Sequence, residues 1–170
     1  QLWSRCDVQP DILQSDGVAL HNWLRFELAG DAAQGFSDAT PNAVTGLLDI
    51  GSDVTNLIFS GQQTLWFRAI GQAGDDVTRS LSRELRISRS QAEQWKREPQ
   101  HVTSWTGFES AIQPCFDQLL GEWHRSTAEF TRILPEESPR RLLCLGGGAA
   151  QWGLIDALRI GAVGSLDADS

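Results

Sequence analysis

Three short apolar runs follow one another in the chain, and turn-forming residues separate them. The runs cover residues 44–50, 54–59 and 64–70, with Gly, Ser and Asp at 51–53 between the first two. Runs of this length that are rich in β-branched and aromatic residues are typical of strands, and Gly, Ser and Asp favour tight turns. The pattern therefore predicts a β-hairpin followed by a third antiparallel strand.

Apolar positions three and four residues apart predict helices before and after these strands. The expected helices cover 16–28, with Gly30 as the stop, a segment capped by Asp75 or Asp76, then 88–98, 108–134 and 149–159. Pro114 marks a start or a kink in the long helix, since proline lacks an NH group. Residues 140–145 read as one more strand, and seven tryptophans at helical or strand spacing are predicted to be core.

Composition narrows the possible partners and the compartment. With 170 residues and 41% hydrophobic content, the chain is long enough to bury the core of one domain or of two small subdomains. A formal net charge of -8 excludes a nucleic-acid binder, because no basic stripe is available to neutralise phosphates. No apolar run could span a bilayer, and three scattered cysteines, Cys6, Cys115 and Cys144, indicate buried thiols in a reducing compartment. We therefore expect a cytoplasmic protein.

The acid and the glycine at the end of the first apolar run allow two interpretations. Asp49 could have a structural role, in which its carboxylate accepts hydrogen bonds from the backbone NH groups of the turn. Alternatively, the tight turn at Gly51 could offer backbone NH groups to a phosphate while Asp49 holds a hard cation, usually through water. The stretch alone does not decide between them.

Two further segments carry candidate chemistry. Glu93 and Lys96, the only lysine, stand three residues apart and share one helix face, as either a surface ion pair or part of a binding site. The glycines at 146–148 lie between an apolar strand and a helix, where they form either a tight connector or a close approach to an anion. Gln151 stands where a Rossmann motif needs its third glycine, and no P-loop sequence is present.

In this order, the three segments resemble the second half of an actin-like ATPase, and within that superfamily most closely the PilM family of type IV pilus assembly proteins. There, a strand ending in Asp-x-Gly forms the second phosphate loop, a helix presents Glu and Lys to adenosine, and a Gly-rich turn underlies the base. The matching positions are Asp49 and Gly51, Glu93 and Lys96, and Gly146, Gly147 and Gly148. Residues 70–97 also resemble the PilM pattern of a Gly-containing loop, a Thr-bearing helix and an Ala-Glu-x-x-Lys-Arg helix.

The resemblance implies an α/β fold, an actin-like (ribonuclease H-like) ATPase subdomain whose mixed sheet begins with an antiparallel hairpin and carries packed helices. It implies ATP and Mg²⁺ as ligands, with Asp49 as the metal residue and the NH groups of residues 51–53 around the phosphates. The full set of implied nucleotide-binding residues is Asp49, Gly51, Ser52, Asp53, Thr55, Glu93, Lys96, Arg97, Gly146, Gly147 and Gly148. No residue is assigned as a catalytic base.

The first phosphate loop of the superfamily and the PilM insertion that receives its partner PilN have no counterpart in the sequence. The chain also begins at Gln1 and contains no Met, which indicates a fragment, an excised domain or a processed start. We expect 1–43 to be the closing strand and helix of a first half plus a linker, 44–160 the nucleotide-binding second half, and 161–170 a tail.

The resemblance implies the ATP-binding half of a PilM-like cytoplasmic protein at the inner face of the inner membrane, in type IV pilus or type II secretion-type assembly. Such a protein would be a weak ATPase at most, inactive as this half alone, with a PilN-like partner bound through the missing first half. The alternatives are a small-molecule kinase or phosphatase of the same fold, and a degenerate scaffold without nucleotide.

Overall fold

The computed structural model of the chain describes residues 12–33 and 43–166. The chain divides into two compact units, Gln1–Asp38 and Ala39–Ser170. The first unit contains helix α2, Asp16–Ala33, which confirms the helix predicted from residue 16. Gly30 does not stop this helix, because a glycine lowers helix propensity by only about 1 kcal/mol and does not remove a backbone donor.

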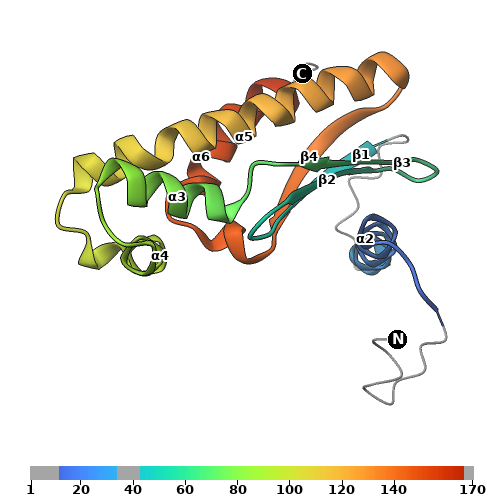
Figure 1. Cartoon of the computed structure of the whole chain (residues 1–170). Helices are drawn as coiled ribbons and strands as arrows, with labels where there is room; N and C mark the ends of the chain where they lie inside the picture. Colours follow the sequence, from blue (N-terminus) through green and yellow to red (C-terminus); the bar gives the residue numbers. More distant parts are fainter. Residues whose placement is uncertain (1–11, 34–42, 167–170) are drawn as a thin grey trace. The chain divides into compact units, whose positions relative to one another are not determined.

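The second unit is built on a four-stranded mixed sheet in the order β3-β2-β1-β4 (Figure 1). The strands are β1 Ala43–Ile50, β2 Thr55–Ser60, β3 Leu65–Ile70 and β4 Ser138–Leu145. β1 pairs antiparallel with β2, β2 pairs antiparallel with β3, and β4 pairs parallel with β1. The predicted hairpin, third antiparallel strand and late strand are therefore confirmed.

Helices follow the third strand and return the chain to the sheet. They are α3 Gly74–Glu84, α4 Arg89–Arg97, the 3-10 turn η1 Pro99–His101, α5 Trp105–Ile133, the 3-10 turn η2 Gly147–Ala150 and α6 Leu154–Leu166. α5 runs across one face of the sheet, and α3 and α6 lie beside it on that face (Figure 1).

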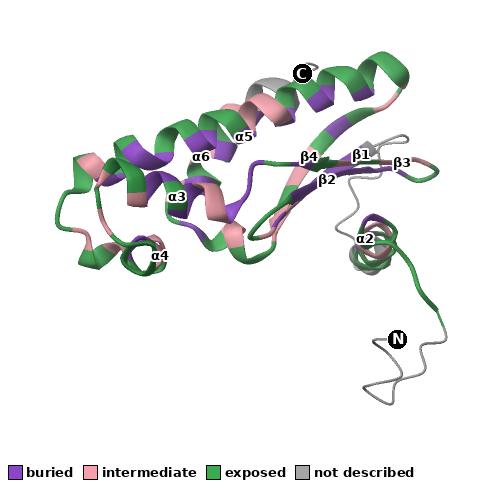
Figure 2. Cartoon of the chain, viewed as in Figure 1, coloured by how far each residue is buried: buried purple, intermediate pink, exposed green. Residues whose placement is uncertain are grey.

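The core lies between this helical layer and the sheet, where buried positions face one another (Figure 2). Phe59 of β2 contacts Trp123 and Phe130 of α5, with ring centroids 5.5 and 4.7 Å apart. A Cβ on Gly46 of β1 would lie 2.5 Å from Cη2 of Trp123, so the glycine makes room for the indole. Each such fully buried side chain contributes about 1.5–3 kcal/mol of transfer free energy, which explains why the helical layer stays on the sheet.

The structure refines three predicted helix features. The N-cap of α3 is Ala73, whose NH group donates to the Asp76 carboxylate across 2.8 Å, so Asp76 takes part in capping the helix from its third position. Of the two roles predicted for Pro114, the start is excluded, because Pro114 lies inside α5 and the buried face continues on both sides of it. α6 begins at Leu154 instead of 149, since η2 and the positive φ of Gly153 (77°) come first.

The cysteines and tryptophans divide between core and surface. Cys115 is buried and Cys144 half-buried, and burial raises the pKa of Cys144 to about 11; Cys6 lies outside the described residues. Trp123 is fully buried as predicted, but Trp23, Trp105 and Trp152 are 46%, 41% and 40% exposed, so the prediction that all seven tryptophans are core was wrong for these three. Among the helices within the described ranges, none is both long and apolar enough to cross a bilayer.

Candidate functional site

A pocket of about 500 Å³ collects the three segments that the sequence singled out. It is lined by Gly51 and Ser52 from the β1–β2 turn, Gly74 at the start of α3, Glu93, Lys96 and Arg97 from α4, and Gly147, Gly148, Ala150 and Gln151 from η2 and the residue after it. These residues come from stretches nearly a hundred positions apart along the chain, so the fold assembles the pocket. We refer to it as the candidate pocket.

The β1–β2 turn is held rigidly from two sides. Within the turn, the NH group of Gly51 donates to the carbonyl oxygen of Val54 across 3.0 Å. From α3, the NH groups of Gly74 and Asp75 donate to the carbonyl oxygens of Gly51 and Ser52 across 3.0 and 2.8 Å. The first NH groups of a helix lack intrahelical partners, so the turn provides them with acceptors and is fixed in return.

These bonds change the expectation for the NH groups of residues 51–53. The Gly51 NH group is used within the turn and is not available to a ligand. The NH groups of Ser52 and Asp53 have no acceptor among the residues that the structure describes. Two of the three expected anion donors therefore remain, at the exposed tip of the turn.

Asp49 lies in β1 just before the turn, half-buried between β2 and β4. The Asn56 side-chain amide donates to its carboxylate across a long 3.4 Å. Within the described ranges no NH group of the bend donates to it, so the turn interpretation of this acid finds no support. Asp49 does not line the candidate pocket, although it is two residues from Gly51, which does. No group of three or more His, Cys, Asp or Glu that could hold a metal occurs in the part of the chain that the structure describes.

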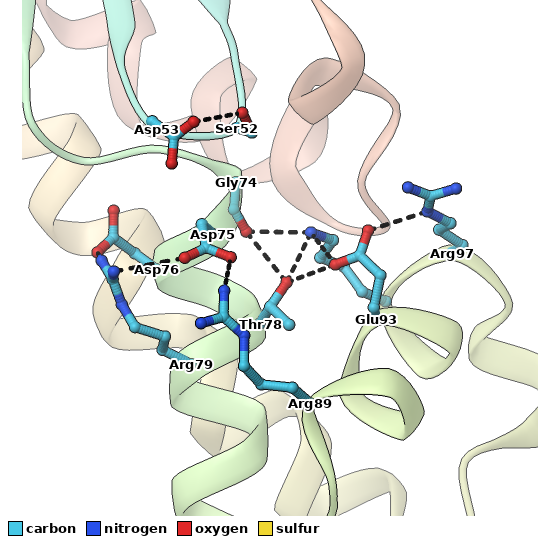
Figure 3. A network of polar contacts seen from close by, with 11 residues as sticks. Ser52, Asp53, Gly74, Asp75, Asp76, Thr78, Arg79, Arg89, Glu93 and Arg97 are labelled. Atoms are coloured by element: carbon cyan, nitrogen blue, oxygen red, sulfur yellow. Dashed lines mark hydrogen bonds and ion pairs between the residues drawn. The ribbon is translucent and has the colours of Figure 1, made fainter.

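Lys96 forms a partly buried brace between α4 and α3 rather than a surface ion pair. Its partners Gly74, Thr78 and Glu93 are shown in Figure 3. Its ammonium nitrogen donates to the Gly74 carbonyl oxygen across 3.1 Å, to the Thr78 hydroxyl across 2.7 Å and to the Glu93 carboxylate across 2.7 Å. The Lys96 side chain is only 15% exposed. All three ammonium protons are thus engaged within the protein, and they tie α4 to the start of α3.

Glu93 is the acidic centre of the same network. The Thr78 hydroxyl donates to one carboxylate oxygen across 2.6 Å, and Nε of the exposed Arg97 donates to the other across 2.9 Å. Burial would raise the pKa of Glu93, but the hydrogen bonds from Lys96, Thr78 and Arg97 outweigh it and lower the pKa from 4.5 to about 2. Glu93 is therefore an anion at neutral pH, and both of its carboxylate oxygens accept hydrogen bonds within the protein.

The three glycines of the late turn have different roles. Gly146 has φ of 85°, and a Cβ there would lie 2.5 Å from the carbonyl oxygen of Ile50. A Cβ on Gly148 would lie 2.3 Å from Cγ2 of Ile50. These two glycines let the turn pack against the end of β1, as the tight-connector interpretation predicts. A Cβ on Gly147 meets no atom within 4 Å, and this residue faces the open pocket.

The remaining predicted residues lie beside the candidate pocket. Thr55 is fully buried, and its hydroxyl donates to the carbonyl oxygen of Gln72 across 2.7 Å, which ties β2 to the segment before α3. Asp53 is exposed and accepts a hydrogen bond from the Ser52 hydroxyl across 2.8 Å. The structure therefore brings seven of the eleven predicted residues to one pocket and leaves Asp49, Asp53, Thr55 and Gly146 outside its lining.

Sequence reasoning missed Gln151. This residue is 8% exposed, it lines the candidate pocket, and its Nε2 atom has no hydrogen-bond partner within the described part of the chain. A buried amide donor without an acceptor is costly, about 1–3 kcal/mol, so such groups occur where a ligand or a rearrangement supplies the missing bond. The available signal was a polar residue three positions after the last of the three glycines, between two alanines and Trp152.

Comparison with solved structures places this geometry among known folds. No protein-family model and no curated protein matches the chain. The PilM-PilN type IV pilus biogenesis complex matches 94% of the chain at 28% identity, with a TM-score of 0.70. The archaeal actin homologue Ta0583 matches 91% of it at 18% identity with a TM-score of 0.56, and the ethanolamine utilization protein EutJ from Carboxydothermus hydrogenoformans matches 82% at 13% identity with a TM-score of 0.53.

The chain spans less than half the length of these solved structures, namely 42%, 48% and 46%. The mixed sheet with its helical layer, the β1–β2 turn and the glycine turn follow one another in the order expected from the resemblance. The chain therefore has the fold of the actin-like ATPases and is similar in structure to the PilM-PilN complex.

Proposed function

We propose that the chain is the ATP-binding half of a PilM-like protein and that the candidate pocket takes MgATP. The observation that carries the proposal is the convergence of three distant segments on one pocket of about 500 Å³, a size typical of small-molecule sites. Among the described residues, the NH groups of Ser52, Gly147 and Gly148 have no backbone acceptor, and the side-chain amide of Gln151 is a donor without a partner. Donors of this kind suit phosphate and nucleotide oxygens.

Nine of the eleven predicted residues have a place in this proposal. The NH groups of Ser52, Asp53, Gly147 and Gly148 would hold the phosphates, and Arg97 would add positive charge at the rim. Asp49 would hold Mg²⁺ through water, which fits a site with one carboxylate, because Mg²⁺ keeps several waters and takes further ligands from phosphate. When bound, the metal neutralises phosphate charge. Lys96, Glu93 and Thr55 would hold the pocket walls in position.

In the whole protein, we propose the division and the role that the resemblance implies. Residues 44–160 would be the second half of the ATPase, 1–43 a closing element and linker, and 161–170 a tail. One of the structural neighbours is a PilM-PilN complex, which supports a PilN-like partner bound through the other half. Such a protein would work at the cytoplasmic face of the inner membrane in type IV pilus or type II secretion-type assembly, with weak ATPase activity at most.

A kinase or phosphatase role has less support. Transfer chemistry of that kind would need a carboxylate free to act as a base in the pocket. Glu93 is the sole carboxylate that lines the candidate pocket in the described residues, and hydrogen bonds from Lys96, Thr78 and Arg97 occupy it. No observation therefore favours this alternative over nucleotide binding.

Thermal unfolding of the full-length protein with and without MgATP tests the proposal. Ligand that binds the folded state stabilises it by about 2.7 kcal/mol at a hundredfold excess over Kd. Gly147→Leu should keep the unliganded melting temperature, because its side chain enters open space, but should lose most of the MgATP shift. Gly71→Leu is the matched control, since a Cβ there also meets no atom within 4 Å and Gly71 does not line the pocket.

Two outcomes of the unfolding experiment would contradict the proposal. A wild-type protein with no MgATP shift would indicate a degenerate scaffold and would overturn the proposal. An MgATP shift that survives in Gly147→Leu would place the nucleotide somewhere other than the candidate pocket.

A further inference from the structure

A second groove, of about 690 Å³, lies between α5 and α6. It shares no residue with the candidate pocket. Its apolar lining comes from both helices and includes Ile112, Phe116 and Leu120 of α5 and Ile160 of α6. Ile160 is 81% exposed, so it forms the rim of the groove. We call this feature the α5–α6 groove.

The two helices touch at one end of the groove. A Cβ on Gly161 of α6 would lie 2.7 Å from Cδ2 of Leu120 in α5, so the helices are in close contact at this glycine. Toward the start of α6, Glu109, Trp152 and Asp156 line the groove instead. The surface therefore presents an apolar trough, and one end of it is lined by the carboxylates of Glu109 and Asp156 and the indole of Trp152. We call this the acidic end.

Contacts within the protein hold the groups of this acidic end in place. Nε1 of Trp105 donates to the Glu109 carboxylate across 3.0 Å. The same indole packs edge to face on Trp152, with ring centroids 4.6 Å apart and planes at 77°. Trp105 also stacks on the buried Phe108, which anchors it to the core. The positions of a carboxylate and an aromatic face are thus fixed before any partner arrives.

The charge of the acidic end is compensated weakly. No Lys or Arg is among the residues that line the groove. Asp156 has an ion pair with Arg159 at 3.8 Å, but both side chains are more than 70% exposed, and such pairs contribute about 0–1 kcal/mol. One oxygen of Glu109 accepts from Trp105, and the carboxylate keeps capacity for another donor. The groove is therefore complementary to a protein segment that carries apolar side chains and, next to them, a positively charged side chain.

We propose that the α5–α6 groove binds a segment of a partner protein whose apolar side chains fill the trough and whose arginine lies at the acidic end, between Glu109, Asp156 and Trp152. Arginine fits because its planar guanidinium donates to carboxylates and stacks on indole rings at the same time. The groove belongs to the half of the fold described here, so this partner is additional to the PilN-like one proposed for the other half. The inference does not depend on nucleotide binding.

A peptide pair tests the charge requirement on the full-length protein. The probe is a short amphipathic peptide with leucines on one face and a single arginine near its end; its match has glutamate in place of the arginine. We expect the arginine peptide to shift the Trp105 and Trp152 indole signals in NMR spectra and to bind about tenfold more tightly than its match. Equal affinity of the two peptides, or no shift at about 1 mM arginine peptide, would overturn the proposal.

Variants locate the binding. Glu109→Gln combined with Asp156→Asn should remove the preference for arginine, while Ile160→Asp should weaken both peptides. The controls are Glu129→Gln and Phe67→Asp, which change an exposed acid of α5 and an exposed aromatic of β3 outside the groove. If the controls lower affinity as much as the groove variants, binding is non-specific and the proposal fails. The positions are exposed, and melting temperatures confirm that each variant is folded.

Discussion

The ammonium nitrogen of Lys96 lies 3.1 Å from the carbonyl oxygen of Gly74, the first residue of α3. The NH group of Gly74 in turn donates to the carbonyl oxygen of Gly51 across 3.0 Å. Lys96 is therefore connected through a single residue to the turn that would hold phosphate. The only lysine of the chain stabilises the wall of the candidate pocket and does not offer a free donor to its occupant.

Lys96→Met should destabilise the unliganded protein. The change keeps most of the side-chain volume but removes three hydrogen bonds and leaves Glu93 partly buried without its main counter-charge. We expect a loss of about 1–3 kcal/mol in the free energy of unfolding, measured by urea denaturation. Arg97→Gln is the control, because Arg97 pairs with the same carboxylate but is 75% exposed, and it should cost about 0.5 kcal/mol or less. Equal stability of Lys96→Met and wild type would show that the brace is not stabilising.

Glu93 should give the protein a pH-dependent share of its stability. Its pKa is about 2 in the folded state against 4.5 for the ordinary group, so the unfolded state binds a proton more readily. The contribution is fully present above pH 4.5 and is lost as the pH falls from there toward 2. Glu93→Gln removes it, so the difference in unfolding free energy between wild type and variant should shrink across that window. A difference that stays constant with pH would contradict the assignment.

Asp49→Asn should separate metal binding from turn structure. The Asp49 carboxylate has one long hydrogen bond, at 3.4 Å from Asn56, and no donor from the bend within the described residues. The unliganded melting temperature should therefore hold or rise. Under the proposed function, the shift from MgATP should fall, while the shift from ATP with EDTA should remain. A variant that melts lower without ligand yet keeps the whole MgATP shift would restore Asp49 as a structural residue.

Gly146→Ala should be far more damaging than Gly147→Ala. At Gly146 a Cβ meets the Ile50 carbonyl oxygen at 2.5 Å and the backbone has φ of 85°, which L-residues rarely adopt. We expect a loss of about 2–4 kcal/mol in chemical denaturation. Gly147→Ala meets no neighbour and should change stability by about 1 kcal/mol or less. Similar losses for the two variants would contradict the division of roles within the glycine turn.

Much of the fold could be predicted from the sequence, because the spacing of apolar residues that distinguishes strands from helices is a property of short, continuous segments. The hairpin, the third strand and the existence of the last strand follow from apolar runs and turn residues, and the long α5 follows from its stripe of buried positions. The parallel pairing of the last strand with β1 is not contained in its own apolar run. The order of the three candidate segments was also visible, and it carried the family resemblance. Helix ends were less predictable: Ala73 caps α3 because the side chain three residues later provides the acceptor.

Tertiary structure alone decided how each polar group is used. Whether the Gly51 NH group is free depends on the geometry of its turn, and whether Lys96 is a surface ion depends on the position of α3 over α4. The tertiary structure also decides that Gln151 is a buried donor without a partner among the described residues, and that Trp105 and Trp152 are exposed. Hydrogen-bond satisfaction and burial are set by residues that are distant in sequence and adjacent in space, so a local pattern does not contain them.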